Sequence, residues 1–404
     1  MKIGIDISEA KKEKRTGIGN YAFLLAEHLR TILPPGDELI KMLPGRGLPF
    51  WNSHVSFAKK IRKAKLDVWH GTANVLPMGL KGGKGSKENT KLVITIHDLA
   101  IYKHPEWFAR GQWFATKVVV PRSIKIADHI IVPSEPTRKD LLELFGVADT
   151  KITVIPLGVE PRFFTRNFHE FRGAEREASI YEFPEATRKK MKLIEINRNL
   201  LSKKYILFVG TLEPRKNITR LIEAYHTLPE DILEGYELVV AGDPSPLSPP
   251  TSGEGKGGGR IKLLDYVPDE DLPALYQNAS LFVYPSLYEG FGLPILEAMA
   301  AGVPVVTSHQ VASNIPGFPG EAVNPLSVDE IRNAIIKYLS PPREYARGTL
   351  SSSGESNNVA ALSSRDVAYA SQISKAGQEL ARQFTWERTA KQTLEIYRNT
   401  IEMQ

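Results

Sequence analysis

Cysteine is absent from the 404 residues of the chain, which excludes disulfides, thiolate metal sites and cysteine nucleophiles. No run of apolar residues approaches the roughly 18 that a membrane-spanning helix needs. The first residues, KIGIDI from Lys2, read as a strand and lack the apolar stretch and cleavage site of a secretory signal. We therefore expect a cytoplasmic protein that does not span a membrane.

Charge is the most uneven property of the chain. Hydrophobic residues make up 42% and charged residues 24%, which is typical of a globular protein long enough for two domains. The net charge is +6, yet residues 1–164 alone hold 26 Lys and Arg against 16 Asp and Glu. So basic a segment suits an anionic membrane, a lipid-phosphate acceptor or nucleic acid. For any single lysine, a solvated surface is the simpler explanation.

Residues 54–67 concentrate this charge. Their pattern predicts a helix with an apolar side and a side of lysine and arginine. Such a helix can lie on an anionic membrane or cover the core of its own domain, and we favour the second interpretation.

The stretch from Tyr284 to Val306 carries the densest pattern. An apolar run typical of a strand stops at a loop with Glu289, Gly290 and Gly292, and a helix is predicted from Pro294 to Gly302. A second strand-like run follows. In a doubly wound α/β sheet, this order leaves the loop at the carboxyl edge of the strands, where ligands bind.

Two carboxylates belong to this stretch. Glu289 lies in the loop and Glu297 on the helix, so both can face one ligand beside the free N–H groups of the helix start. Gly290 and Gly292 let the backbone approach that ligand closely. These groups suit a nucleotide sugar, although a solvated or ion-paired side chain explains either glutamate alone.

The whole string EGFGLPxLEAMAxGxPVV resembles the donor-binding segment of retaining family-4 glycosyltransferases (group 1), and its context resembles GDP-mannose-dependent members. The resemblance implies an α/β fold of two Rossmann-like, doubly wound domains that face each other across a cleft (GT-B). It also implies that Glu289 contacts the transferred sugar and Glu297 the ribose. The amides of Phe291, Gly292 and Leu293 would hold sugar hydroxyls and phosphate.

Two segments of the N-terminal half extend the resemblance. The TGIGNY loop, expected to precede a helix from Tyr21 to Leu33, implies that Gly17 and Gly19 face the donor phosphates. IHDLAIYKHPEWF places His97 and Asp98 where a strand ends. A lone histidine there is usually structural, but the resemblance implies that His97 contacts the transferred sugar and that Asp98 assists.

The segment GTLEPRKN carries two cations before a helix predicted to begin at Asn217. Arg215 and Lys216 suit a diphosphate whose negative charge grows as the sugar departs, and the resemblance implies that Lys216 clamps this leaving group. Thr211 stands where many relatives have arginine, so we expect Arg215 to carry that charge. The turn at Val267 is where the family holds the nucleobase.

These segments predict the domain boundaries. We expect an acceptor-side domain over residues 1–164, a connector over 165–203, and a nucleotide-sugar-binding domain over 204–385. A helix over 386–404 would return to the first domain. Residues 165–203, 244–260 and 341–365 are inserts that the resemblance does not cover.

The predicted reaction is the metal-independent, retaining transfer of a hexose, first of all mannose from GDP-mannose, with UDP- and ADP-hexoses left open. The expected acceptor is a glycan, a lipid-linked or another hydroxyl compound in polysaccharide biosynthesis, and the basic half fits peripheral contact with an anionic membrane. We expect a metal-free displacement with no cofactor besides the nucleotide-sugar donor, because there is no DxD metal pair near the donor segment, and the sequence offers no Ser-His-Asp arrangement. Side chains of four residues are the candidate catalytic groups: His97, Asp98, Lys216 and Glu289.

Other functions fit parts of the pattern. A nucleotide-sugar epimerase or a glycan phosphorylase could use the same scaffold, and a phosphorylase would turn over with inorganic phosphate and no nucleotide. A catalytically silent nucleotide-sugar binder is also possible on this scaffold, but the presence of Glu289, Glu297, Lys216 and His97 together argues against it. A nucleic-acid binder is disfavoured, because aromatic residues are not interleaved with the basic ones.

Overall fold

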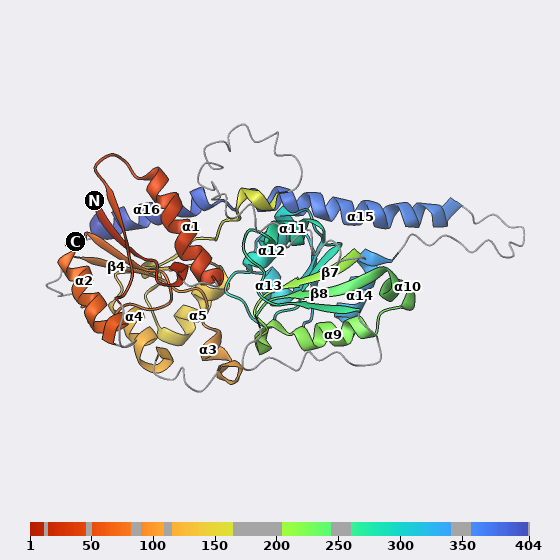
Figure 1. Cartoon of the computed structure of the whole chain (residues 1–404), viewed down its shortest axis with the longest axis horizontal. Helices are drawn as coiled ribbons and strands as arrows, with labels where there is room; N and C mark the ends of the chain where they lie inside the picture. Colours follow the sequence, from red (N-terminus) through yellow and green to blue (C-terminus); the bar gives the residue numbers. More distant parts are fainter. Residues whose placement is uncertain are drawn as a thin grey trace, which may run out of the picture. The chain divides into compact units, whose positions relative to one another are not determined.

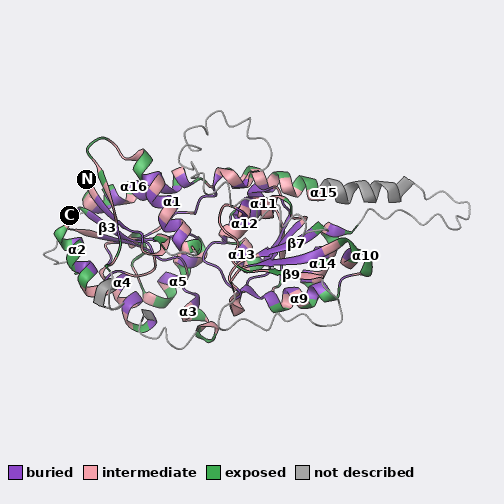
Figure 2. Cartoon of the chain, viewed as in Figure 1, coloured by how far each residue is buried: buried purple, intermediate pink, exposed green. Residues whose placement is uncertain are grey.

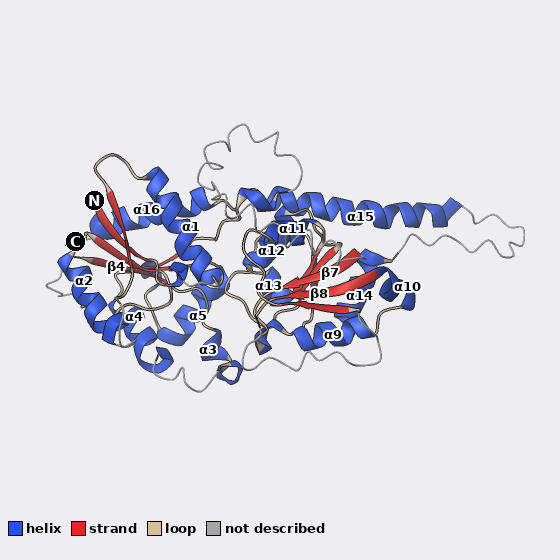
Figure 3. Ribbon diagram, viewed as in Figure 1, coloured by secondary structure: helices blue, strands red, loops and turns tan. Residues whose placement is uncertain are grey.

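The computed structural model describes residues 1–11, 15–45, 51–81, 90–108, 115–164, 204–243, 260–340 and 357–402. Two six-stranded sheets with parallel ladders are flanked by helices (Figures 1 and 3). Contacts divide the chain into two compact units, one of residues 1–158, 289–293 and 384–404, the other of residues 159–288 and 294–383. The predicted class, two doubly wound α/β sheets, is confirmed. The connector 165–203 and residues 244–259 and 341–356 of the predicted inserts lie outside the described residues.

The first sheet has the strand order β2-β1-β3-β4-β5-β6. Its strands are β1 (Lys2–Asp6), β2 (Glu38–Met42), β3 (Val68–Gly71), β4 (Lys91–Thr95), β5 (His129–Val132) and β6 (Ile152–Val154). Every residue of β3 and β5 is buried, as expected for parallel strands covered by helices on both faces. The order reverses between β1 and β3, and such a switch point is where doubly wound sheets bind ligands.

Within the described residues, the helices of the first unit are α1 (Gly17–Ile32), α2 (Phe57–Lys63), α3 (Ala100–Lys103), α4 (Val120–Ile126), α5 (Glu135–Phe145) and α16 (Trp386–Glu402). The last helix packs along α1. Ser134 caps α5, its hydroxyl accepting the Thr137 N–H at 3.3 Å. The first unit also has short 3-10 turns at Glu9–Lys11, Pro105–Trp107 and Asp149–Lys151 and π-helical turns at Trp51–Ser56 and Ala115–Val119. The 3-10 turns at Pro161–Phe163 and Pro214–Lys216 belong to the second unit.

Two helices of this unit differ from the predicted bounds. The first, α1, begins at Gly17 rather than at Tyr21, so Gly17 and Gly19 form its first turn instead of a loop. Gly19 is required there by space, because a Cβ would lie 2.7 Å from the Glu9 carbonyl oxygen. The helix predicted over residues 54–67 is shorter, because α2 ends at Lys63 before Lys65 adopts a positive φ of 51°.

Phe57, Ala58 and Ile61 on the apolar side of α2 are buried in the hydrophobic core of the first unit, while the lysines and the arginine of this helix are exposed (Figure 2). This favours the helix as a cover of its own domain, with only the charged side facing solvent. Among the described residues, no helix combines the length and apolar character needed to cross a membrane.

The second sheet has the order β12-β11-β10-β7-β8-β9. Its strands are β7 (Lys204–Val209), β8 (Tyr236–Ala241), β9 (Ile261–Leu264), β10 (Leu281–Tyr284), β11 (Val305–Ser308) and β12 (Glu321–Val323). Counted along the chain this is the Rossmann order, with its switch point between β7 and β10. The loops that follow these two strands are those on which the sequence placed Lys216 and Glu289.

The helices of the second unit are α9 (Ile218–His226), α10 (Glu230–Gly235), α11 (Leu272–Gln277), α12 (Leu293–Ala300), α13 (His309–Ala312), α14 (Val328–Leu339) and α15 (Asn357–Ala381). α12 begins one residue before the predicted Pro294 and ends before Gly302, whose φ is 72°. α9 begins one residue after Asn217. Residues 357–365 of the predicted third insert are the first turns of α15.

Candidate functional site

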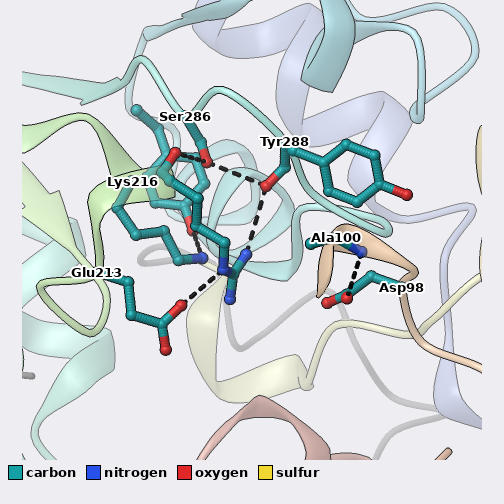
Figure 4. A network of polar contacts seen from close by, with 8 residues as sticks. Asp98, Ala100, Glu213, Lys216, Ser286 and Tyr288 are labelled. Carbon is teal, nitrogen blue, oxygen red and sulfur yellow. Dashed lines mark hydrogen bonds and ion pairs between the residues drawn. The ribbon is translucent and has the colours of Figure 1, made fainter. Parts of the chain in front are cut away.

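Lys216 lies at the switch point of the second sheet, in the turn between β7 and α9. Its side chain is only 7% exposed. The ammonium donates a hydrogen bond to the hydroxyl of Tyr284, the last residue of β10, and lies 5.1 Å from the centre of that ring (Figure 4). A cation is thus held, largely desolvated, where the loops of β7 and β10 diverge.

Arg215 connects these two loops. Its guanidinium pairs with Glu213 at 2.6 Å and donates to the Tyr288 carbonyl at 3.3 Å (Figure 4). Its own carbonyl accepts the Ser286 hydroxyl at 3.0 Å and the Leu287 N–H at 2.7 Å. Arg215 therefore stabilises the loop that leads into Glu289, and its charge is shared with Glu213.

Glu297 is buried on α12. Burial raises the pKa of its carboxyl group to about 8, and Glu160 adds to this shift, whereas the Tyr276 hydroxyl and Arg162 oppose it. At pH 7 this carboxyl group is mostly protonated, so it can both donate and accept hydrogen bonds. These three neighbours were not predicted, because nothing in the local pattern around Glu160, Arg162 or Tyr276 links them to α12.

Thr211 and Val267 follow β7 and β9, and both are partly exposed. The Thr211 carbonyl accepts the Glu213 N–H at 2.8 Å, which shapes the turn before Lys216. Both residues thus lie beyond the carboxyl ends of their strands, where ligands bind in such sheets.

His97 and Asp98 follow β4 in the first unit. The Nε2 atom of His97 lies 2.7 Å from the Thr72 carbonyl oxygen, and since a carbonyl only accepts, Nε2 carries the proton. Burial lowers the pKa of this histidine, which keeps the ring neutral. A carboxylate oxygen of Asp98 accepts the Ala100 N–H at 3.2 Å and so shapes the start of α3 (Figure 4).

Glu289 to Leu293 count with the first unit. A Cβ at Gly290 would lie 1.8 Å from the His97 carbonyl oxygen, so only glycine fits against this strand end. The Gly290 carbonyl accepts hydrogen bonds from the hydroxyls of Ser134 and, at 3.1 Å, Thr137. The Glu289 side chain is 8% exposed. The structure thus brings the start of the glycine loop against His97.

The remaining residues of this loop, Phe291 to Leu293, are defined by side-chain packing, backbone conformation and the start of a helix. Phe291 is buried against Phe384, with 6.0 Å between ring centres, and Gly292 has a φ of 107°. Leu293 opens α12. Glu289 counts with the first unit and Glu297 with the second, so their shared ligand stays a prediction.

A buried chain of polar groups behind His97 was not predicted. His70 on β3 binds the Tyr397 hydroxyl through Nδ1 at 2.6 Å and the Thr95 hydroxyl through Nε2 at 2.7 Å. Thr95 is 2.8 Å from the Tyr21 hydroxyl, and the Tyr21 ring packs edge-on against His97 at 4.7 Å. Burial lowers the pKa of His70 to about 3, so this row of hydrogen-bonded side chains carries no charge.

Acidic and histidine side chains do not gather elsewhere into a metal-ligand set: within the described ranges, no group of three or more could hold a metal ion.

Family models and known proteins match the chain over most of its length. The model for Glycosyltransferase Family 4 covers residues 20–163, and that for Glycosyl transferases group 1 covers residues 190–349. O-antigen chain mannosyltransferase B of Escherichia coli is 30% identical over 343 residues, which are 84% of this chain and 76% of that protein.

Solved structures share the fold. Sucrose-phosphate synthase of Thermosynechococcus elongatus superposes with a TM-score of 0.66 and 20% identity over all of both chains. The Anabaena protein HepE, solved in complex with UDP and glucose, gives a TM-score of 0.61 and 16% identity over 98% of this chain and 99% of that chain. At these identities the likeness establishes the architecture only.

Proposed function

The chain belongs to the group 1, family-4 glycosyltransferases of GT-B architecture, and from this premise we propose that it transfers mannose from GDP-mannose to a glycan or lipid-linked hydroxyl with retention of configuration. As a member of the family it is a transferase that takes its sugar from a nucleotide sugar. The donor, acceptor, stereochemistry and metal independence are the parts that we propose.

Lys216 carries the proposal. It is a buried cation, fixed by Tyr284, at the switch point of a Rossmann-ordered sheet. In the proposed reaction its ammonium binds the diphosphate as the bond from the anomeric carbon to the phosphate oxygen breaks. A preformed cation in a desolvated site stabilises this developing charge without reorganising. Arg215 adds a second positive group next to it.

The sugar is assigned to the groups around the glycine loop. Glu289, His97 and Asp98 bind its hydroxyls, and the amides of Phe291 to Leu293 hold hydroxyl and phosphate oxygens. Three observations support this assignment: Glu289 is buried, the His97 ring is neutral, and Gly290 lies directly against the His97 main chain. Gly17 and Gly19, in the first turn of α1, are assigned to the donor phosphates.

The nucleoside is assigned to the second unit. Glu297 binds the ribose hydroxyls, to which a protonated carboxyl group can donate as well as accept. The turn at Val267 holds the base, and Thr211 lies at the phosphate end. GDP-mannose is preferred because the relative with 30% identity is named a mannosyltransferase. UDP- and ADP-hexoses are the competing donors, the former because HepE was solved with UDP.

The proposed step needs no base from the protein. The acceptor oxygen bonds to the anomeric carbon on the face that the phosphate leaves, and the leaving phosphate oxygen takes the acceptor proton. The protein contributes position and electrostatic stabilisation. Peripheral contact with an anionic membrane is supported only by the exposed charges of α2, which include Lys59, Lys60, Arg62 and Lys63.

The decisive experiment titrates the purified chain with GDP-mannose, UDP-glucose and ADP-glucose by calorimetry. The tightest donor is then assayed with lipid-diphosphate and free-sugar acceptors, with and without EDTA, and the anomeric proton of the product is read by NMR. We expect GDP-mannose to bind tightest, EDTA to have no effect, and the α configuration to be kept. Inversion, loss of activity in EDTA, or turnover with inorganic phosphate and no nucleotide would each refute the corresponding part.

A further inference from the structure

Asn74 lies in the turn after β3 and has a φ of 61°, which is uncommon for a residue other than glycine. Its N–H donates to the Thr95 carbonyl at 3.1 Å, and its side-chain Oδ1 accepts the His97 N–H at 2.7 Å. A residue in a parallel ladder makes this pair of bonds with its own N–H and its own carbonyl. The Asn74 amide oxygen therefore replaces a main-chain carbonyl and extends the ladder beyond the Gly71 and Ile94 pair.

The same turn holds the His97 ring. The Thr72 carbonyl accepts the Nε2 proton, so the lone pair of the neutral ring is on Nδ1. No hydrogen bond to Nδ1 is made by the residues that the structure describes. The Tyr21 ring packs edge-on against the imidazole, and the backbone of Gly290 packs directly against the His97 carbonyl oxygen. His97 thus presents one hydrogen-bond acceptor from a fixed ring.

We propose that Asn74 is a positioning residue, which holds the His97 main chain so that Nδ1 of the ring accepts a hydroxyl proton of the transferred sugar. This inference rests on the proposed function, because it takes the sugar as the group that His97 faces. Asn74 itself contacts no reacting atom and acts through His97.

Asn74 is well suited to this role for a steric reason. The chain packs closely on itself after Gly71, where a Cβ would lie 2.6 Å from the Val75 carbonyl oxygen, and the His97 N–H pairs with the Asn74 side chain instead of a main-chain carbonyl. Asparagine tolerates the left-handed conformation better than most residues, and its side chain supplies the missing acceptor. A glycine would adopt the conformation but leave the His97 N–H without this partner.

The test compares Asn74→Gly, which keeps the backbone conformation and removes the acceptor, with Asn74→Asp, which keeps an acceptor at the same place. Lys65→Gly is the matched control, since Lys65 is an exposed residue of the same unit with a positive φ of 51°. The first readout is long-range proton–nitrogen NMR of the histidine rings without donor, with His97 assigned from a His97→Gln variant. The second is kcat and KM for GDP-mannose.

We expect the His97 ring signals to move or broaden in Asn74→Gly and to stay in place in Asn74→Asp and Lys65→Gly. The kcat of Asn74→Gly should fall about 10–100-fold, as expected for a small misplacement of a sugar-binding group, with KM within about threefold and a melting temperature close to that of Lys65→Gly. Asn74→Asp should retain kcat within about fivefold.

Unchanged ring signals and kcat in a folded Asn74→Gly protein would overturn the proposal, as would a loss of melting temperature that accounts for all of the lost activity. If Asn74→Gly does not fold, Asn74→Asp decides: native ring signals and kcat support the proposal, and loss of either at an unchanged melting temperature refutes it. Absence of turnover in the wild-type chain with every nucleotide sugar would refute the proposed function, whereas the NMR comparison would still report on Asn74.

Discussion

Replacing Lys216 by methionine tests the leaving-group assignment most directly, because the change removes the charge and keeps an unbranched apolar side chain. The ammonium is largely desolvated beside the Tyr284 ring. Two unit charges about 4 Å apart interact by about 4 kcal/mol at an effective dielectric constant of about 20. Loss of one preformed donor to a developing oxyanion costs about 10²–10³-fold in kcat, and the two magnitudes agree.

The assay measures GDP release from GDP-mannose at saturating acceptor, with donor affinity determined separately by calorimetry. We expect Lys216→Met to lower kcat by about 10²–10³-fold and donor affinity by no more than about tenfold, because the diphosphate charge is greatest after bond cleavage. Tyr284→Phe is the matched control: it removes the hydroxyl that accepts from Lys216 and keeps the cation and the ring, so its kcat should fall by about tenfold or less.

A kcat within threefold of wild type in a folded Lys216→Met protein would refute the clamp. A loss that appears only in donor affinity would refute the argument that the interaction strengthens as the bond breaks. Equal losses in Lys216→Met and Tyr284→Phe would show that the pair supports the loop rather than the leaving group.

Three further predictions follow from the buried groups. Burial raises the pKa of Glu297 to about 8, whereas its carboxyl group ionises near pH 4.5 in the unfolded chain, so the wild-type protein should lose stability as the pH rises from 5 to 8. Glutamine does not ionise, and Glu297→Gln should therefore gain melting temperature relative to wild type over this range and show no gain at pH 4. Donor binding should weaken in the same variant. Gly290→Ala places a Cβ 1.8 Å from the His97 carbonyl oxygen and should lower kcat by about 100-fold, whereas Gly235→Ala, with no atom within 4 Å of the added Cβ, should not. Tyr397→Phe leaves Nδ1 of His70 buried without its partner and should cost about 1–3 kcal/mol in the free energy of unfolding, measured by urea denaturation.

The inner strands of both sheets could be predicted from the sequence, because strands covered on both faces are continuous apolar runs, as in β7 and β10. β2 was not predicted, since only Met42 of this edge strand is buried and Lys41 interrupts its apolar residues. A helix start with a side-chain cap also leaves a signal in the sequence, as Ser134 does at the start of α5. The predicted start of α1 at Tyr21 was wrong, because glycine is as common in loops as in helix ends and the pattern does not show that Gly17 and Gly19 form the first turn.

The candidate site was only partly accessible from the sequence. Lys216, Glu289 and Glu297 could be singled out because short motifs surround them. The partners of the site residues could not, since Tyr276 approaches Glu297, Tyr284 approaches Lys216 and Thr72 approaches His97 only through the topology of the sheets. Asn74 is similar: its role depends on a left-handed turn beside the end of β4, and only the three-dimensional pairing shows what its amide replaces.

The helix α16 has a consequence for the order in which the protein can fold. Trp386 and Tyr397 pack against Tyr21 and His70 in the earliest part of the chain, and nothing between residues 294 and 383 belongs to that unit. We therefore expect that, during synthesis, the first sheet completes its packing only after α16 has been made. Until then the apolar surface that α16 covers and the His70 imidazole would be exposed to water. Ribosome-bound chains that stop before residue 384 should be cleaved by protease in the first sheet, and adding α16 as a separate peptide should protect it.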